Sequence, residues 1–207
     1  MRPKDWDRRY GTADSVFLET PNRFLVAEVS GLRPGRALDL GSGAGRNAVW
    51  LAERGWTVTA VDFSKVGMAK ARRLGTARGV EVDWVLADLL EYEPQPSAFS
   101  LVLYLYVQLP AEERRSVLAK AAAAVAPGGT LLALGHHTRN LTEGWGGPKS
   151  PDVLYTPGEV AAELPGLVIE KAEDVVRPVE TEEGAFEAID ALVRASRPAG
   201  RGVTLVR

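Results

Sequence analysis

Short apolar runs alternate along the chain with longer segments in which apolar residues recur every three or four positions. This order is typical of parallel strands joined by helices that cover both faces of a sheet. The strands expected in the first two thirds of the chain are residues 36–40, 57–61, 80–86, 100–106 and 130–134. The helices expected between them are residues 46–54, 65–74 and 110–125. The predicted fold class is therefore α/β, a doubly wound Rossmann-like sheet that is mostly parallel.

Polar residues, prolines and glycines mark where these helices begin and end. Ser64 is an expected N-cap, and Gly75 is placed just beyond the expected end of the same helix. Pro110 opens the alanine-rich helix, and the Pro-Gly-Gly turn at 127–129 ends it.

The pattern is less regular in the last third of the chain. Residues 136–157 are rich in Gly, Asn, Thr and Pro, and a loop of that length is more often functional than idle. A short helix is expected over 159–164 and a strand over 167–176. Residues 186–196 fit a strand by alternation and a helix by three- and four-residue spacing, and we favour the strand.

Composition excludes several classes of protein. The 207 residues suit a single domain spanning 1–207, and a formal net charge of −2 provides no field to attract nucleic acid or an anionic membrane. The chain has no cysteine, which excludes disulfides and thiolate nucleophiles, and its two adjacent histidines do not have zinc-site spacing, so no metal is expected. No apolar run approaches the roughly 20 residues that cross a bilayer. We expect a soluble, cytoplasmic protein.

The strongest chemical signal lies between the first strand and the first helix. Gly41, Gly43 and Gly45 allow a sharp turn and a close approach of the backbone to a ligand. A dinucleotide fingerprint requires a glycine three residues after the second one, and Arg46 occupies that position. Asp39 precedes the loop, where its carboxylate repels a pyrophosphate but suits an ammonium and a sulfonium. S-adenosylmethionine carries both charges and no phosphate.

Two further acids stand at the ends of the next strands. Asp62 lies about 20 residues past the loop, where a carboxylate accepts hydrogen bonds from both ribose hydroxyls. Asp88 follows the third strand and suits the adenine amino group, although a helix cap is the other interpretation of Asp88. Doubly wound sheets bind ligands at the carboxyl ends of their strands, where all three acids are expected.

At these residues the chain resembles the class I S-adenosylmethionine-dependent methyltransferases, over roughly Trp6 to Pro198. The shared motifs are Asp39-x-Gly41-x-Gly43-x-Gly45, Asp62-Phe63-Ser64, Ala87-Asp88 and Pro127-Gly128-Gly129. The resemblance implies a sheet of seven strands whose last strand is antiparallel, which supports a strand over 186–196. It also implies S-adenosyl-L-methionine as cofactor and S-adenosyl-L-homocysteine as product.

The resemblance further implies a role for each acid. Asp39 binds the methionine amino group, Asp62 the ribose and Asp88 the adenine, while Phe63 packs on the adenine and the main chain of Leu89 borders it. The expected cofactor-binding residues are Tyr10, Asp39, Gly41, Ser42, Gly43, Gly45, Asn47, Asp62, Phe63, Ser64, Asp88, Leu89 and Tyr104.

Missing motifs restrict the methyl acceptor. Residues 103–110 lack the Asn/Asp-Pro-Pro-Tyr-like motif of enzymes that methylate exocyclic amines of DNA bases. Methylation of cytosine C5 or of arsenite through a thiolate is excluded because cysteine is absent. The small size and residues 6–10 resemble small-molecule methyltransferases, including the tellurite-resistance-type branch. Residues 1–30 are then expected to cover the cofactor, and residues 136–157 to form a loop on the substrate side.

The candidate catalytic residues follow the fourth and fifth strands. A histidine is the natural base near neutral pH, which makes His136 and His137 candidates beside Tyr106, although either histidine also fits a solvated loop. A base is needed only where the acceptor loses a proton. The flanking glycines of Trp145 allow the loop to close, and anchoring of the loop is the other interpretation of this residue. The expected substrate contacts are Trp6, Gln108 and Trp145.

The sequence thus predicts an enzyme that transfers a methyl group from S-adenosylmethionine to a small molecule, as a monomer or homodimer. A non-catalytic S-adenosylmethionine-binding protein has the same loop and acids and is the first alternative. An NAD(P)-binding oxidoreductase is disfavoured by Arg46 and by the lack of a Tyr-x-x-x-Lys motif. The acceptor and its attacking atom are left open.

Overall fold

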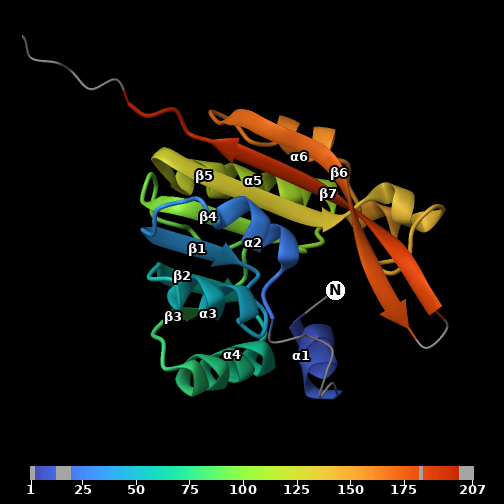
Figure 1. The fold of residues 1–207 in the computed structure, drawn as a ribbon, viewed down its shortest axis with the longest axis horizontal. Helices are drawn as coiled ribbons and strands as arrows, with labels where there is room; N and C mark the ends of the chain where they lie inside the picture. Colours follow the sequence, from blue (N-terminus) through green and yellow to red (C-terminus); the bar gives the residue numbers. More distant parts are fainter. Residues whose placement is uncertain (1–2, 13–19, 182–183, 201–207) are drawn as a thin grey trace, which may run out of the picture.

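A seven-stranded sheet runs through the protein and carries helices on both faces, as a computed structural model shows (Figure 1). The structure describes residues 3–12, 20–181 and 184–200. The strands are β1 (Arg36–Leu40), β2 (Thr57–Asp62), β3 (Asp83–Leu86), β4 (Phe99–Leu105), β5 (Val125–His136), β6 (Val168–Thr181) and β7 (Gly184–Ser196). The helices are α1 (Pro3–Thr12), α2 (Arg23–Val29), α3 (Arg46–Ala52), α4 (Lys65–Arg78), α5 (Ala111–Ala124), α6 (Pro157–Ala162) and the 3₁₀ turns η1 (Thr138–Leu141) and η2 (Pro151–Val153).

The strand order is β3-β2-β1-β4-β5-β7-β6. Strands β1 to β5 pair in parallel, whereas β7 is antiparallel to both β5 and β6. The predicted α/β class and the antiparallel last strand are therefore confirmed, and residues 186–196 form a strand. The alternation of apolar residues therefore predicted this strand correctly, where three- and four-residue spacing also fitted a helix. The strand β7 lies between β5 and β6 in the sheet.

Helix α4 is longer than the sequence predicted. Ser64 caps its start as expected, since the Ser64 Oγ accepts a hydrogen bond from the Gly67 N–H at 3.0 Å. The expected stop at Gly75 is wrong, because the helix continues to Arg78 and ends at Gly79, whose φ is 66°. Gly75 instead lies inside the helix and lets it pack closely against the ring of Trp84.

The other strand boundaries also shift. Strand β3 begins at 83 rather than 80, and β5 extends over 125–136, so the predicted turn at 127–129 lies within it. Strand β6 runs to 181, past the predicted end at 176, because it pairs with β7 along a hairpin that projects from the body of the sheet (Figure 1). The predicted loop over 136–157 is only partly irregular, since it contains η1 and η2.

The two faces of the sheet have separate hydrophobic cores. On β4, Val102 and Tyr104 point into the core beneath α5, while Leu101 and Leu103 point into the core beneath α2 and α3. This division follows from the period-two alternation of side chains along a strand. It explains why β4 is a continuous apolar run, as expected for a strand buried on both faces.

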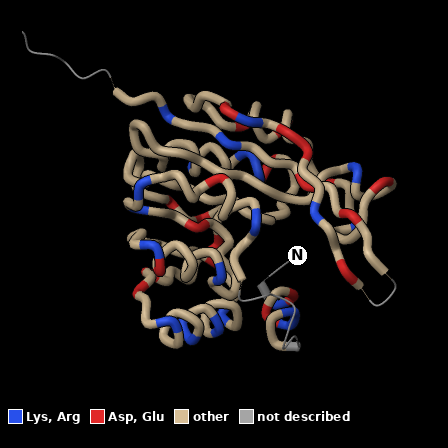
Figure 2. Tube along the Cα trace, viewed as in Figure 1, with Lys and Arg blue, Asp and Glu red and all other residues tan. Residues whose placement is uncertain are grey.

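Lys and Arg residues alternate with Asp and Glu residues along much of the Cα trace (Figure 2). Within the ranges that the structure describes, no helix combines the length and apolar character needed to cross a bilayer.

One ion pair is buried under the sheet. The Arg114 Nε donates to the Glu163 Oε2 at 2.8 Å and the Arg114 Nη2 donates to Oε1 at 2.9 Å, so the pair is bidentate. The side chains are 3% and 8% exposed. The guanidinium carbon also lies 5.2 Å from the centre of the Tyr155 ring. The pair therefore fixes α5 against the segment that follows α6.

We expect Glu163→Gln to lower the free energy of unfolding by about 3–5 kcal/mol, because it leaves the Arg114 guanidinium buried without its counter-charge. Chemical denaturation measures the loss. The control is the double variant Arg114→Met with Glu163→Leu, which removes both charges and is expected to lose less. A double variant that is less stable than Glu163→Gln contradicts this account.

Candidate functional site

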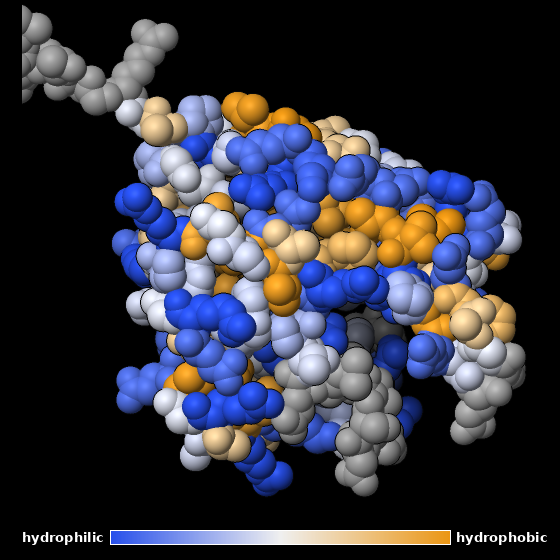
Figure 3. Space-filling view, in the orientation of Figure 1, coloured by the Kyte–Doolittle hydropathy of each residue, from blue (hydrophilic) through white to orange (hydrophobic). Residues whose placement is uncertain are grey.

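The strand order reverses direction between β1 and β4. The carboxyl ends of these two strands lie side by side, with the end of β5 next to that of β4. Doubly wound sheets bind ligands in the crevice at this reversal. The side chain of Val107, just past β4, packs on Gly41, just past β1. The surface is hollowed beside these strand ends, on the side of the β6–β7 hairpin (Figure 3). The candidate site is built here.

The loop between β1 and α3 requires its glycines. Gly41, Gly43 and Gly45 have φ values of 74°, 57° and 84°, in the left-handed region that favours glycine. A Cβ atom at Gly43 would collide with the hydroxyl of Tyr10, and one at Gly45 would lie 2.7 Å from the ring of Trp84. The loop thus turns sharply and lets neighbouring side chains pack directly on its backbone.

Asp62 fixes this loop from the end of β2. Its Oδ2 accepts a hydrogen bond from the Gly43 N–H at 2.8 Å, and its Oδ1 accepts from the Ser64 N–H at 2.8 Å. Burial nevertheless raises the pKa of Asp62 above its usual value, against the effect of these two hydrogen bonds. One carboxylate therefore joins the glycine loop to the start of α4.

Asp39 lies beneath the same loop and is only 1% exposed. Among the described residues its Oδ2 has no hydrogen-bond partner, and neither has the buried hydroxyl of Ser42. Burial, with a smaller contribution from Asp62, raises the pKa of Asp39 to about 7, and Arg46 opposes the shift. An unpartnered buried carboxylate is costly and indicates a place for a cationic donor.

Helix α1 packs against the start of α4 beside the loop (Figure 1). The Asp7 Oδ1 accepts hydrogen bonds from the Ser64 Oγ at 2.6 Å and from the Val66 N–H at 3.2 Å. Tyr10 is buried on Gly43, with the ring of Trp6 centred 5.7 Å from its own. The sequence did not identify Asp7, because an acid within an exposed, charged helix carries no distinguishing signal.

The remaining cofactor candidates lie around the loop. Asn47 at the start of α3 accepts a hydrogen bond from the Asn22 N–H at 3.0 Å, which anchors the segment before α2. Asp88 is exposed after β3, and its Oδ1 accepts from the Leu90 N–H at 3.0 Å. Phe63 is half-buried and Leu89 is buried. The end of β2 and the loop after β1 are thus brought together, with Asp88 at the next strand end.

Tyr104 does not belong to this group. Its side chain is fully buried in the core beneath α5, together with Val117 and Tyr155. The expectation that Tyr104 contacts the cofactor is wrong, because its position on β4 turns it into the core rather than toward the strand end.

Two predicted substrate contacts are held by other parts of the protein. The Gln108 Nε2 donates to the carbonyl of Val153 at 2.5 Å, and its Oε1 accepts from the His136 N–H at 3.1 Å. Trp145 stacks on Phe186 of β7, with ring centres 3.9 Å apart. Both side chains anchor the segment between β5 and α6, which is a correction for Gln108 and the alternative that the sequence left open for Trp145.

His137 also has a structural role, so its assignment as a base is wrong. Its Nδ1 accepts a hydrogen bond from the Arg139 N–H at 2.9 Å and caps η1. Its Nε2 lies 3.3 Å from the Asp174 Oδ1 on β6. Both ring nitrogens are therefore occupied.

His136 and Tyr106 are brought together around Asp190 of β7. The Tyr106 hydroxyl donates to the Asp190 Oδ2 at 2.6 Å, the Arg177 Nε donates to the same oxygen at 3.0 Å, and the His136 Nδ1 lies 3.3 Å from Oδ1. The sequence did not identify Asp190 or Arg177. Asp190 is one of three charged residues in β7, with Glu187 and Arg194, so its charge alone did not distinguish it.

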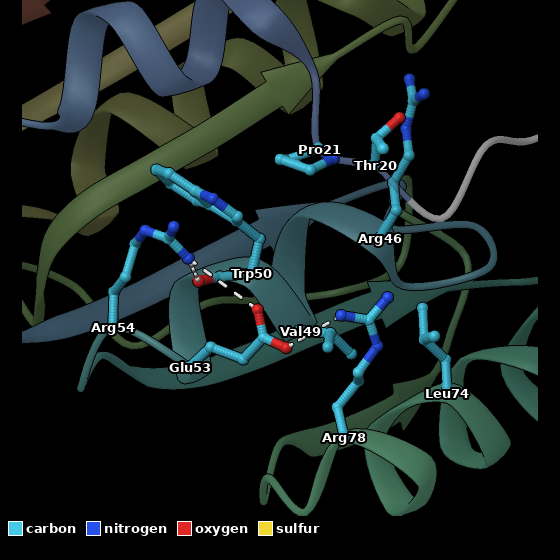
Figure 4. Close-up of a pocket in the computed structure, with 9 residues that line it drawn as sticks. All are labelled: Thr20, Pro21, Arg46, Val49, Trp50, Glu53, Arg54, Leu74 and Arg78. Carbon is cyan, nitrogen blue, oxygen red and sulfur yellow. Dashed lines mark hydrogen bonds and ion pairs between the residues drawn. The ribbon is translucent and has the colours of Figure 1, made fainter.

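A separate cavity of about 140 Å³ lies on the outer side of α3 (Figure 4). Its Glu53 carboxylate lies between Arg54 and Arg78, at 3.8 and 3.4 Å, and Arg54 lies 4.2 Å from the centre of the Trp50 ring. None of the residues expected to bind cofactor or substrate lines it. The lining residues are Thr20, Pro21, Arg46, Val49, Trp50, Glu53, Arg54, Leu74 and Arg78.

Comparison with known proteins agrees with this geometry. Residues 37–129, which contain the glycine loop, Asp62 and Asp88, match a family described as a methyltransferase domain. The demethylmenaquinone methyltransferase of Thermus thermophilus is 36% identical over 103 residues, which cover 49% of this chain and 47% of that protein. The chain thus spans about half the length of the curated relatives it matches.

Solved structures extend the likeness of fold over most of the chain. TehB from Haemophilus influenzae has a TM-score of 0.69 at 17% identity and covers 95% of this chain and 67% of its own. Magnesium protoporphyrin IX methyltransferase from Synechocystis, solved with bound S-adenosylmethionine, has a TM-score of 0.60 at 18% identity and covers 94% and 79%. Residues 37–129 are thus similar to a methyltransferase domain, and the chain shares its fold with these solved structures.

Proposed function

We propose that this chain binds S-adenosylmethionine at the carboxyl ends of β1, β2 and β3 and transfers its methyl group to a small molecule. The main support for the proposal is the buried carboxylate of Asp39 beneath the glycine loop, whose Oδ2 has no hydrogen-bond partner among the described residues. A cationic nucleoside without phosphate satisfies this carboxylate, whereas a pyrophosphate is repelled by it. The match of residues 37–129 to a methyltransferase domain supports the same conclusion.

The residues present fit this cofactor. Asp39 is suited to the methionine ammonium group. Each oxygen of Asp62 accepts one main-chain hydrogen bond and retains a lone pair for a ribose hydroxyl. Asp88 is exposed at the next strand end, where it is suited to the adenine amino group, and half-buried Phe63 offers an apolar surface to the ring.

The bound cofactor supplies a methyl group that is already activated by a positive sulfur. The protein's own task is therefore to align the acceptor and exclude water, and alignment alone contributes about 7–11 kcal/mol to such reactions. Helix α1 contributes to the exclusion of water, because Asp7 and Tyr10 hold it against the loop.

A small-molecule acceptor is supported by the relatives, which are named as methyltransferases of demethylmenaquinone and of ubiquinone biosynthesis. Because the chain spans about half of their length, their substrates are not transferred to it. Membership of the tellurite-resistance-type branch stays a prediction, as do the single domain over 1–207, a cytoplasmic location, a monomeric or homodimeric state and the lack of nucleic-acid partners.

We expect Asp62→Ala to weaken S-adenosylmethionine binding by about 1.5–3 kcal/mol, which is roughly 10- to 150-fold in Kd, since hydrogen bonds to a charged group are lost. Calorimetry with S-adenosylmethionine, S-adenosylhomocysteine and NAD measures this loss of affinity. Asp83→Ala, an exposed acid at the opposite end of β3, is the matched control and should bind normally. Tight binding of NAD with no response to the adenosyl compounds would defeat the proposal.

We expect the affinity for S-adenosylmethionine to rise about tenfold per pH unit below about pH 7 and then to level off. The pKa of Asp39 is raised to about 7 by burial, and the ligand's ammonium requires the ionised carboxylate. Calorimetry between about pH 5.5 and 7.5 measures this slope, and Asp39→Asn should remove it. An unchanged slope in Asp39→Asn would assign the proton to another group.

The same raised pKa predicts an effect on the protein without cofactor. The folded state binds the Asp39 proton more tightly than the unfolded state, so this group lowers stability as pH rises from about 4 to 7. Asp39→Asn should therefore be more stable than the natural protein at about pH 8, by thermal denaturation, while binding the cofactor less tightly.

A further inference from the structure

Asp190 is the centre of a cluster of polar side chains that hold one another in fixed orientations. Asp190 is fully buried in β7, opposite His136 in the β5–β7 register. Its Oδ2 accepts from both Tyr106 and Arg177, and its Oδ1 faces the His136 Nδ1. These contacts lower the pKa of Asp190 despite its burial, so the carboxylate stays ionised.

The orientation of His136 follows from this contact. An ionised carboxylate accepts hydrogen bonds only, so the buried Nδ1 that faces it carries the ring proton. The ring side chain is 17% exposed, and within the described part of the chain its Nε2 makes no hydrogen bond. The Nε2 lone pair is thus available to take a proton from another molecule.

The cluster lies beside the proposed cofactor site. Tyr106 and Val107 follow β4; Val107 packs on Gly41, and the Tyr106 ring is centred 5.0 Å from the His136 ring. Tyr106 has a φ of 57°, a left-handed conformation that is costly for a bulky residue and that clusters at functional sites. It is kept there by the Asp190 hydrogen bond and by its own N–H, which donates to the Leu134 carbonyl at 2.6 Å.

Two guanidinium groups lie near this point, each with a carboxylate close by. The Arg177 guanidinium lies 5.9 Å from the centre of the Tyr106 ring, and Arg46, at the start of α3, interacts electrostatically with Tyr106, Asp39 and Arg177. Arg177 is paired with the ionised Asp190 and Arg46 interacts with Asp39, so these charges are balanced by carboxylates. The preference for a hydroxyl comes from the histidine, because a base is needed where the acceptor loses a proton as it attacks.

We propose that Asp190 is a positioning residue that holds His136 with its proton on Nδ1, and that the His136 Nε2 acts as general base on a weakly acidic hydroxyl of the acceptor. The proposal rests on the proposed function for its methyl donor. It adds the class of acceptor and the residues on the acceptor side, of which Tyr106 and Arg177 position Asp190.

The acceptor O–H proton passes to the His136 Nε2, and an oxygen lone pair forms the bond to the methyl carbon. The bond from that carbon to the sulfonium sulfur breaks, and its electron pair remains on sulfur as the neutral thioether of S-adenosylhomocysteine. The imidazolium then releases its proton to water. Such base catalysis contributes about 10²- to 10⁴-fold in rate.

The chain has only two histidines, so the tautomer can be read directly by ¹⁵N nuclear magnetic resonance of the protein labelled at histidine. With both rings in the neutral form, we expect His136 to carry its proton on Nδ1 and His137 on Nε2. The difference follows because the His137 Nδ1 already accepts from the Arg139 N–H. A proton on Nε2 in His136 overturns the proposal.

Asp190→Asn provides a sharper test of the same point. The two donors, Tyr106 and Arg177, orient the new amide so that its oxygen occupies the Oδ2 position and its NH₂ faces the His136 Nδ1. We expect the His136 proton to move to Nε2. Asp174→Asn, beside His137, is the matched control and should leave the His136 signals unchanged. Unchanged His136 signals in Asp190→Asn contradict the positioning role.

The class of acceptor is tested by measuring the rate at which phenols are methylated, with S-adenosylmethionine as the donor. The series consists of para-substituted phenols whose pKa values run from about 7 to about 10. We expect Asp190→Asn and His136→Ala to lower kcat/KM by about 10²- to 10⁴-fold for the weakest acids, and by less than tenfold for phenols already ionised in the assay. An equal loss across the series indicates a merely structural role and overturns the proposal.

Calorimetry separates this proposal from the proposed function. Normal S-adenosylmethionine binding with no methylation of any phenol overturns the hydroxyl acceptor and leaves the cofactor site standing. If the natural protein does not bind S-adenosylmethionine, the proposed function is overturned. The tautomer of His136 is measured without any cofactor, so that test is independent of the proposed function.

Discussion

The architecture of the site depends on the carboxylate of Asp62. It accepts from the Gly43 N–H in the first loop and from the Ser64 N–H at the start of α4, so one side chain at the end of β2 sets the position of two neighbouring turns. Helix α1 depends on the same arrangement, because Asp7 binds Ser64 and Tyr10 lies on Gly43. A carboxylate can serve two donors and still accept from a ligand, which an amide cannot do equally well.

A second acid beneath the loop has the opposite character. Asp39 is buried, its Oδ2 has no donor among the described residues, and its pKa is raised to about 7. Such a group costs stability in the protein alone and becomes favourable when a cation reaches it. The contrast with Asp190, which is equally buried but whose Oδ2 accepts from Tyr106 and Arg177, separates a carboxylate suited to a ligand from one that orients its neighbours.

The sequence carried enough information for the sheet and the cofactor side, but less for the acceptor side. Glycines with positive φ and acids at strand ends act through local geometry, which residue order specifies directly. Tyr104, Gln108 and His137 were misjudged because nearness to a strand end does not reveal which way a side chain turns. Asp190 was missed because its partners come from strands far apart in the sequence, and pairing at that distance leaves no local pattern.

The β6–β7 hairpin links these parts mechanically. Phe186 stacks on Trp145, and the Glu187 carbonyl accepts from the Trp145 N–H at 2.8 Å, so the hairpin holds the segment that crosses over His136. Gly147 of that segment lies against the imidazole, where any side chain at residue 147 would strike the ring. The stacked aromatic pair therefore keeps this segment in place over the imidazole, and the lack of a side chain at residue 147 is what leaves room for the ring.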